Sequence, residues 1–206
     1  MAPMSSNNKP TSEQAPAKLA PELQQILLVT ARKTVEYGLA QHRLPTIDYR
    51  EYPLPLQHQG ASFVTLSIDG ELRGCIGSLE AQRPLIEDIS RNAYAAAFQD
   101  PRFPPLSKAE CPLLHIHISI LSPPVAMAFS SEADLLQQLQ PHVDGLILES
   151  RDGHRGTFLP TVWQSLPDPR AFLRQLKLKA GLSADYWSND LQVYHYTTLS
   201  FGEDRG

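Results

Sequence analysis

Cys75 is the side chain in this sequence best suited to chemistry. It lies in the run Leu72-Arg73-Gly74-Cys75-Ile76-Gly77-Ser78, directly after a tight-turn signal, Asp69-Gly70. A thiolate is a strong nucleophile, and the charge of a neighbouring arginine favours the thiolate over the thiol. In a regular strand Arg73 and Cys75 share a face, and arginine rarely points into a dry core. The alternative is that Cys75 is a small apolar side chain in the core.

The residues around Cys75 suggest how a substrate would be held. Glycine inside a strand usually marks a bulge or a close approach by another backbone or a ligand, so we expect Gly74 to let a substrate come close. The string Asp100-Pro101-Arg102 adds a second guanidinium, which could clamp an anionic substrate together with Arg73. The alternative is an ion pair between Asp100 and Arg102 that fixes the turn.

A third candidate region, with Arg155 and Thr157, joins a predicted strand to a predicted helix. Thr157 offers a hydroxyl, and the helix that begins near Pro160 offers free amide N–H groups for an anion. The alternative, which we favour, is a structural joint anchored by Phe158 and Trp163.

Arginines are the recurring charge in these strings, at positions 73, 102 and 155. If two of them faced one cleft without acidic partners, the ligand would be an anion. Ion pairing with Asp100, Glu71 or Glu80 is the competing account, and we favour it slightly.

No metal or cofactor is predicted. His115 and His117 are two residues apart on a predicted strand, a spacing that can bind a transition metal, but no third ligand is apparent. The sequence also lacks a P-loop, G-x-G-x-x-G, C-x-x-C, H-E-x-x-H and G-x-S-x-G, which removes the commonest nucleotide, zinc and hydrolase sites.

The composition is that of an ordinary globular protein of 206 residues with a formal net charge of −4. That charge gives no electrostatic footprint for nucleic acid, and the apolar runs are far too short to span a membrane. Cys75 and Cys111 are the two cysteines, and without a secretory signal we expect both to be reduced, in a cytoplasmic setting. Residues 1–17 read as a disordered tail before a domain over 18–206.

The spacing of apolar residues predicts α+β structure with a mainly antiparallel sheet, because strands occur in local pairs mixed with helices. The segment 44–59, with three prolines, is expected to be an extended connector without helix. The predicted helices are 21–42, 84–99, 130–140, 161–165 and 169–180, and the predicted strands are 61–68, 72–79, 113–121, 145–150, 156–158 and 191–199.

Together the runs 72–78, Asp100–Leu106 and Gly156–Pro160 resemble the AMMECR-one domain, called AmmeMemoRadiSam system protein A in prokaryotes. The resemblance covers roughly residues 19–201. It implies an α+β fold with a larger and a smaller lobe, and it implies that the string beginning at Asp100 lies close to the strand of Cys75.

The resemblance leaves two functional hypotheses. In the first, the protein is an enzyme or a substrate-binding component that uses Cys75 and Arg73 in a cleft and acts with Memo-like and radical-SAM proteins on a small anionic substrate. The chain has no C-x-x-x-C-x-x-C triad, so it would not itself hold a radical-SAM cluster. In the second, the signature strings form the docking groove of a non-enzymatic adaptor. A reactive, accessible thiol at Cys75 distinguishes the two.

Overall fold

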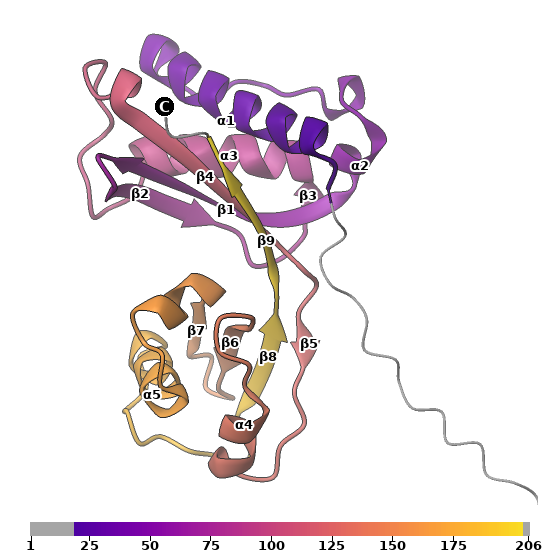
Figure 1. The fold of residues 1–206 in the computed structure, drawn as a ribbon, viewed down its shortest axis with the longest axis vertical. Coiled ribbons are helices and arrows are strands. Elements are labelled where there is room, and N and C mark those ends of the chain that lie inside the picture. Colours follow the sequence, from indigo (N-terminus) through magenta and orange to yellow (C-terminus); the bar gives the residue numbers. More distant parts are fainter. Residues whose placement is uncertain (1–18, 204–206) are drawn as a thin grey trace, which may run out of the picture.

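Two lobes, each with its own antiparallel sheet, make up the computed structural model, which describes residues 19–203 (Figure 1). The tail predicted at 1–17 lies outside these residues. The helices are α1 (Pro21–Gln41), α2 (Leu54–Gln57), α3 (Leu85–Phe98), α4 (Glu132–Gln138) and α5 (Pro169–Lys179), with single 3-10 turns η1 (Tyr49–Glu51), η2 (Cys111–Leu113) and η3 (Pro160–Gln164). The strands are β1 (Gln59–Ile68), β2 (Glu71–Gly77), β3 (Arg83–Pro84), β4 (Leu114–Leu121), β5 (Val125–Ala126), β6 (Gly145–Glu149), β7 (Arg155–Phe158), β8 (Gln192–Tyr196) and β9 (Thr198–Gly202).

The larger lobe contains the sheet β2-β1-β4-β9, with β3 paired to one end of β1. Helices α1 and α3 lie together against one face of this sheet (Figure 1). Alternate residues of β1 and β4 point toward the helices and are buried, as the period-two pattern predicted. The core between sheet and helices contains Leu27, Val35, Val64, Ile86, Ile89, Ile116 and Ile118.

The β1–β2 hairpin that carries Cys75 turns at Asp69-Gly70. Both residues have positive φ, 53° and 85°, which a type I′ turn requires, so the tight turn expected here is present. Leu72 pairs with Ser67 and Gly74 with Leu66, so Arg73 is an extra residue in a β-bulge. The bulge interrupts the regular alternation that would place Arg73 and Cys75 on one face, and it agrees with the expectation that the glycines of this strand mark a bulge.

The smaller lobe contains the sheet β5-β8-β6-β7, covered by α4, α5 and η3 (Figure 1). Its core is separate from that of the larger lobe and is built around Trp163 and Phe172, whose rings stack with centroids 3.7 Å apart. Ser131 caps α4 by accepting the N–H of Asp134, and Gly181 has the positive φ of a residue that ends a helix.

The chain passes between the lobes twice, at residues 121–125 and 196–198. The last strand, predicted as one element over 191–199, is in fact two strands in different sheets that meet at Thr197. Here the N–H of Ser122 donates to the Thr197 carbonyl at 2.9 Å, so the two crossings are hydrogen-bonded to each other. A small apolar cluster joins the lobes: Ala61 and Leu121 from one, Ile147 and Tyr196 from the other.

The connector before β1 departs from its prediction. It contains η1 and the single-turn helix α2, although it was expected to be free of helix. Proline is tolerated in the first turn of a helix, where its missing N–H would have no partner in any case, and Pro55 lies there in α2. The other predicted helices and strands are found within a few residues of their expected bounds. In the described part of the chain, no helix is long and apolar enough to cross a membrane.

Candidate functional site

Cys75 lies on β2, an edge strand of the larger sheet, and its side chain is half-buried beside Thr65 on β1. The Thr65 hydroxyl donates to the Cys75 sulfur at 3.3 Å, which fixes the position of the sulfur. The backbone of Cys75 faces away from β1. Its N–H donates to Asp100 Oδ2 at 2.9 Å, and its carbonyl accepts from Arg102 Nη2 at 3.3 Å. Cys75 and Cys111 are both free thiols, as expected.

Asp100 and Arg102 therefore take the place of a neighbouring strand along the edge of β2. The buried Asp100 carboxylate accepts both Nη2 and Nε of Arg102, at 2.6 and 2.9 Å. The bound guanidinium holds the pKa of Asp100 far below its usual range, against the opposing effect of burial, and the N–H of Cys75 adds to the lowering. Such caps protect an edge from pairing with other chains.

The Arg73 side chain reaches into the loop that follows α3. Its Nε donates to Glu110 at 2.7 Å and its Nη2 donates to the Pro104 carbonyl at 2.9 Å. The hydrogen bond from Arg73, followed by those from Ser107, lowers the pKa of Glu110 to about 2. The Phe103 ring lies close to the guanidinium groups of both Arg73 and Arg102, 5.8 and 5.4 Å from its centroid. Arg73 thus holds this loop against β2.

Gly74 makes no room for a substrate. A Cβ on Gly74 would lie 2.1 Å from the carbonyl oxygen of Ala96 in α3, so the close approach that the glycine permits is that of the helix backbone. The predicted role of Gly74 beside a ligand is therefore replaced by a packing role inside the larger lobe.

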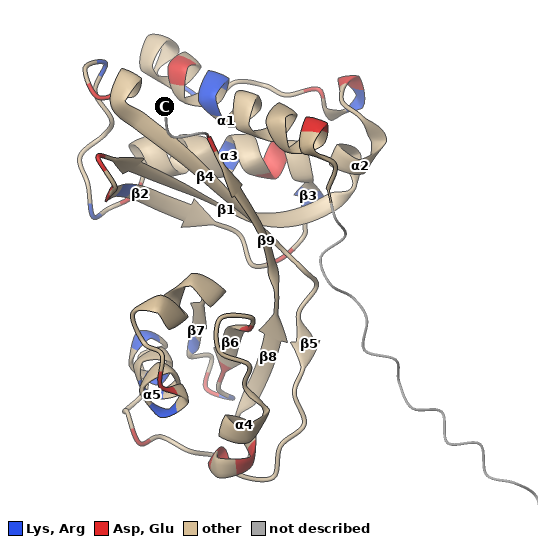
Figure 2. Ribbon diagram, viewed as in Figure 1, with Lys and Arg blue, Asp and Glu red and all other residues tan. Residues whose placement is uncertain are grey.

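Helix α5 of the smaller lobe carries several basic residues (Figure 2), and Lys179 is the last residue of this helix. Desolvation lowers the pKa of the Lys179 ammonium; Cys75 raises it and the Arg102 guanidinium lowers it, so all three groups lie within electrostatic reach. The ammonium lies 5.0 Å from the centroid of the Phe158 ring. Among the described residues, no carboxylate forms an ion pair with Lys179. We call Cys75, Arg102 and Lys179 the seam site.

The side chains of Arg155 and Thr157 contact groups other than Cys75. Arg155 pairs with Glu80 at 3.0 Å and with Glu149 at 2.7 Å. The Thr157 hydroxyl donates to the Leu146 carbonyl at 2.8 Å, within the smaller sheet. All three arginines of the signature strings thus have acidic partners. Arg102 and Arg155 pair with Asp100 and Glu80, which the ion-pairing account named, whereas Arg73 pairs with Glu110, which it did not name.

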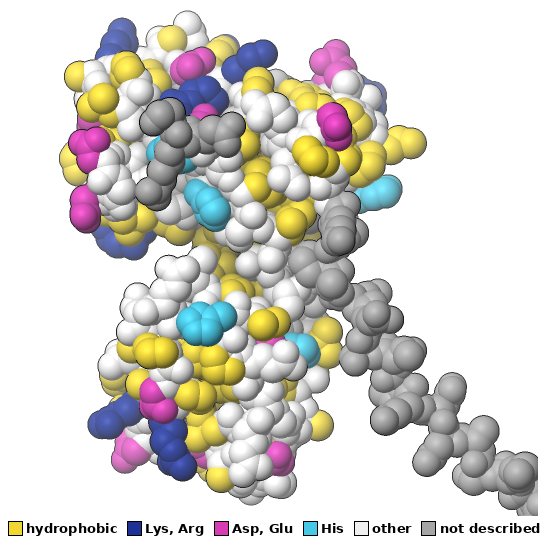
Figure 3. Space-filling view, viewed as in Figure 1, with side chains coloured by type: hydrophobic (Ala, Val, Ile, Leu, Met, Phe, Trp, Pro, Cys, Tyr) yellow, Lys and Arg dark blue, Asp and Glu magenta, His cyan; other side chains and the backbone are white. Residues whose placement is uncertain are grey.

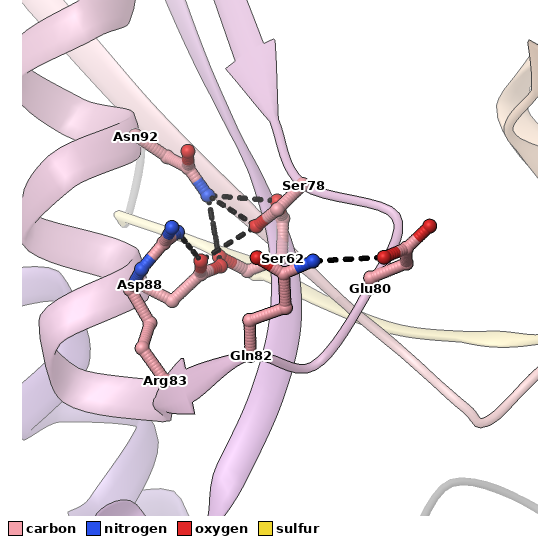
Figure 4. Close-up of polar contacts among 7 residues, drawn as sticks. All are labelled: Ser62, Ser78, Glu80, Gln82, Arg83, Asp88 and Asn92. Atoms are coloured by element: carbon pink, nitrogen blue, oxygen red, sulfur yellow. Dashed lines mark hydrogen bonds and ion pairs between the residues drawn. The ribbon is translucent and has the colours of Figure 1, made fainter.

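A buried polar network next to β2 was missed by the sequence analysis. Asp88 of α3 is fully buried, and its carboxylate accepts from Ser62, Ser78, Arg83 and Asn92 at 2.6–2.9 Å (Figure 4). Every oxygen of this carboxylate is satisfied by two donors. The network ties the loop that follows β2 to the helix behind it, and thereby fixes the C-terminal end of the Cys75 strand.

The histidine pair is on β4, and burial lowers the pKa of His117, with a smaller effect from His115. Within residues 19–203, no group of three or more histidine, cysteine, aspartate or glutamate side chains is arranged to hold a metal ion.

Comparison with known proteins identifies the family. The AMMECR1 family model matches residues 28–201, which include all of the strings described above. The chain belongs to the AMMECR1 family. A relative from Sulfolobus acidocaldarius is 40% identical over 168 residues, covering 78% of this chain and 74% of the relative. A relative from Methanothermobacter thermautotrophicus is 36% identical over 187 residues, covering 86% and 93%.

The AMMECR1 fold has also been solved by crystallography. The uncharacterised protein PH0010 from Pyrococcus horikoshii is 32% identical and superimposes with a TM-score of 0.82, over 89% of this chain and 92% of that chain. The geometry above gives physical roles to the AMMECR1 strings: 72–78 is a bulged edge strand, and Asp100–Leu106 is the cap that covers its edge. The predicted proximity of these two strings is confirmed.

Proposed function

We propose that this AMMECR1-family protein binds a small anionic substrate at the seam site, and that the Cys75 sulfur is its reactive group. The observation that carries the proposal is the Lys179 ammonium, which comes from the opposite lobe and has no carboxylate partner among the described residues. Lys179 is exposed and has no acidic partner within residues 19–203, so its ammonium is available to a ligand, and its place within electrostatic reach of a half-buried thiol suits a ligand that supplies the missing charge.

The charge balance of the seam site supports an anion over a cation. Asp100 and Arg102 neutralise each other, which leaves the charge of Lys179 in excess. Arg102 is also 53% exposed at its side chain, so a ligand can reach the guanidinium without breaking its bonds to Asp100. The arrangement suits nucleophilic attack by the sulfur on a substrate that is held through its anionic group, the work of an enzyme or of its substrate-binding component.

Alkylation of Cys75 with two reagents of different charge tests this proposal. In a Cys111→Ser background, the folded protein is treated with iodoacetate and with iodoacetamide, which react by the same displacement of iodide. We expect Lys179→Gln to lower the ratio of the iodoacetate rate to the iodoacetamide rate about three- to tenfold. A unit charge acting over several ångströms near a protein surface is worth about 1 kcal/mol. Lys33→Gln, on the exposed side of α1, is the matched control and leaves the ratio unchanged.

Two outcomes would contradict the proposal. One is a Cys75 that neither reagent modifies in the folded protein. The other is a rate ratio that is the same in wild type and in Lys179→Gln. An inert Cys75 favours the second candidate function, a non-enzymatic adaptor, which has no use for an accessible thiol.

Cooperation with Memo-like and radical-SAM proteins stays a prediction, based on the family resemblance. Co-purification of the tagged protein with the Memo-like and radical-SAM proteins of the same cell tests it. The Lys179→Gln variant shows whether the seam site takes part in that association.

A further inference from the structure

A cavity of about 420 Å³ lies between the lobes, and Cys75 is not among its lining residues. Leu79 and Leu121 line it from the larger lobe, and Ile147 and Tyr194 line it from the smaller lobe. Its volume is within the range of small-molecule sites, and its walls are mostly apolar. The molecule narrows between the lobes, with apolar side chains at the waist on the face shown in Figure 3.

Three charged side chains lie on the wall of this cavity. Arg155 is placed between two carboxylates: its Nη1 contacts Glu80 Oε1 at 3.0 Å, and its Nε contacts Glu149 Oε1 at 2.7 Å. The second oxygen of Glu80 accepts from Gln82 at 2.8 Å. Among the described residues, no donor contacts the second oxygen of Glu149. The wall therefore carries one excess negative charge, with a free acceptor on Glu149.

We propose that this cavity binds a small molecule with an apolar body and a protonated amine. The body lies between the two apolar walls, where it is removed from water, and the ammonium donates to the free oxygen of Glu149. An anionic ligand is disfavoured, because Glu149 and Glu80 outnumber Arg155. The inference does not depend on the seam site, whose ligand has the opposite charge.

Three indole compounds that differ only in their terminal group test the charge preference. Binding of tryptamine, tryptophol and indole-3-propionate to the full chain is measured by calorimetry, together with Cys75→Ser as a reference variant. We expect tryptamine to bind at least about tenfold more tightly than indole-3-propionate, with tryptophol between them. Cys75→Ser binds tryptamine as the wild type does.

Two substitutions locate the binding. Glu149→Gln is expected to weaken the binding of tryptamine about three- to tenfold and to leave the binding of tryptophol unchanged. The control variant Glu36→Gln, on α1, is expected to change the binding of neither compound. Ala81→Trp, at an exposed position on the cavity wall, fills the space and abolishes binding of both compounds. Thermal unfolding shows that each variant is folded.

The proposal is overturned if no compound binds at millimolar concentration, or if indole-3-propionate binds as tightly as tryptamine. It is also overturned if Ala81→Trp, shown to be folded, binds tryptamine unchanged. The alkylation rates of Cys75 test the seam site and have no bearing on the binding of indole compounds to this cavity. The seam-site proposal and the cavity proposal can therefore be refuted independently.

Discussion

At Gly74 the backbones of β2 and α3 come into contact, which makes this position intolerant of any side chain. The Ala96 carbonyl, 2.1 Å from the site of a Cβ, belongs to a helix and does not move easily. We expect Gly74→Ala to destabilise the protein by about 3 kcal/mol, which lowers Tm by about 6–12 °C. Gly70→Ala is the control. It has open space around it but a φ of 85°, so it costs only about 1 kcal/mol. Equal losses in the two variants would contradict this account.

The pH dependence of stability includes a contribution from Glu110. Its hydrogen bonds to Arg73 and Ser107 lower its pKa in the folded protein to about 2. A lowered pKa gives stability that is present above about pH 5 and is lost as the pH falls toward 2. We expect Glu110→Gln to cost about 1–2 kcal/mol at pH 7, since solvent screens this partly exposed pair, and almost nothing near pH 2.

Urea unfolding of wild type and Glu110→Gln at several pH values measures this difference. Because the other carboxyl groups titrate in both proteins, the difference isolates Glu110. The control variant Glu36→Gln, on α1, should differ little from wild type in its free energy of unfolding at every pH. If the difference between wild type and Glu110→Gln did not depend on pH, the lowered pKa of Glu110 would not be its cause.

The arginines show which contacts of single residues could be predicted from the sequence. Ion pairing was predicted as the favoured account, and Arg102 does pair with Asp100. The partner of Arg73 was not predictable, because Glu110 is 37 residues away and the bulge changes the direction of the side chain. Lys179 was not among the predicted site residues. Its closeness to Cys75 depends on how the lobes meet, which no local pattern records.

At the scale of elements, the Asp88 network fastens the Cys75 strand to α3. Replacing Asp88 leaves Arg83 and two serine hydroxyls without their acceptor, so we expect Asp88→Ala to cost about 3–5 kcal/mol. Glu87→Ala is the control, because both residues lie in the first turn of α3 and share its helix-dipole effect. The difference in urea midpoints then measures the network. A similar small loss in both variants would show that the buried carboxylate contributes little.

Most elements were predictable because their apolar periods and turn residues are local signals. Asp69-Gly70 set the hairpin, and Gly181 set the end of α5. The split of the last strand at Thr197 was not predictable, because both halves have the same β-forming composition and differ only in which sheet receives them. Asp88 gave only a weak signal, a carboxylate among apolar helix positions. Its donors come from β1, the loop after β2, β3 and α3 itself.

At the scale of the whole molecule, the two lobes have separate cores and few connections. The chain crosses between them twice, the cluster around Ile147 and Tyr196 packs across the boundary, and Arg155 reaches Glu80. Within the described residues, that contact is the single ion pair between the lobes. Both proposed sites lie at this boundary, so the relative position of the lobes controls them together. The resemblance implied two lobes, but the composition of the boundary came only from the structure.

We expect Glu80→Gln to loosen the boundary without unfolding either lobe. Glu80 and Arg155 are 56% and 39% exposed at their side chains, so solvent screens the pair, its contribution to stability is small, and Tm changes by only a few degrees. Hydrogen exchange of the loop 78–82 and of β7 should nevertheless accelerate, because these segments are joined by that pair.

Glu149→Gln is the matched control: it removes the other partner of Arg155, within the smaller lobe, and keeps the link to Glu80. Raising the salt concentration should bring the exchange rates of wild type closer to those of Glu80→Gln, because salt screens exposed ion pairs. Exchange that accelerates equally in both variants, or in neither, would mean that the apolar cluster alone holds the lobes together.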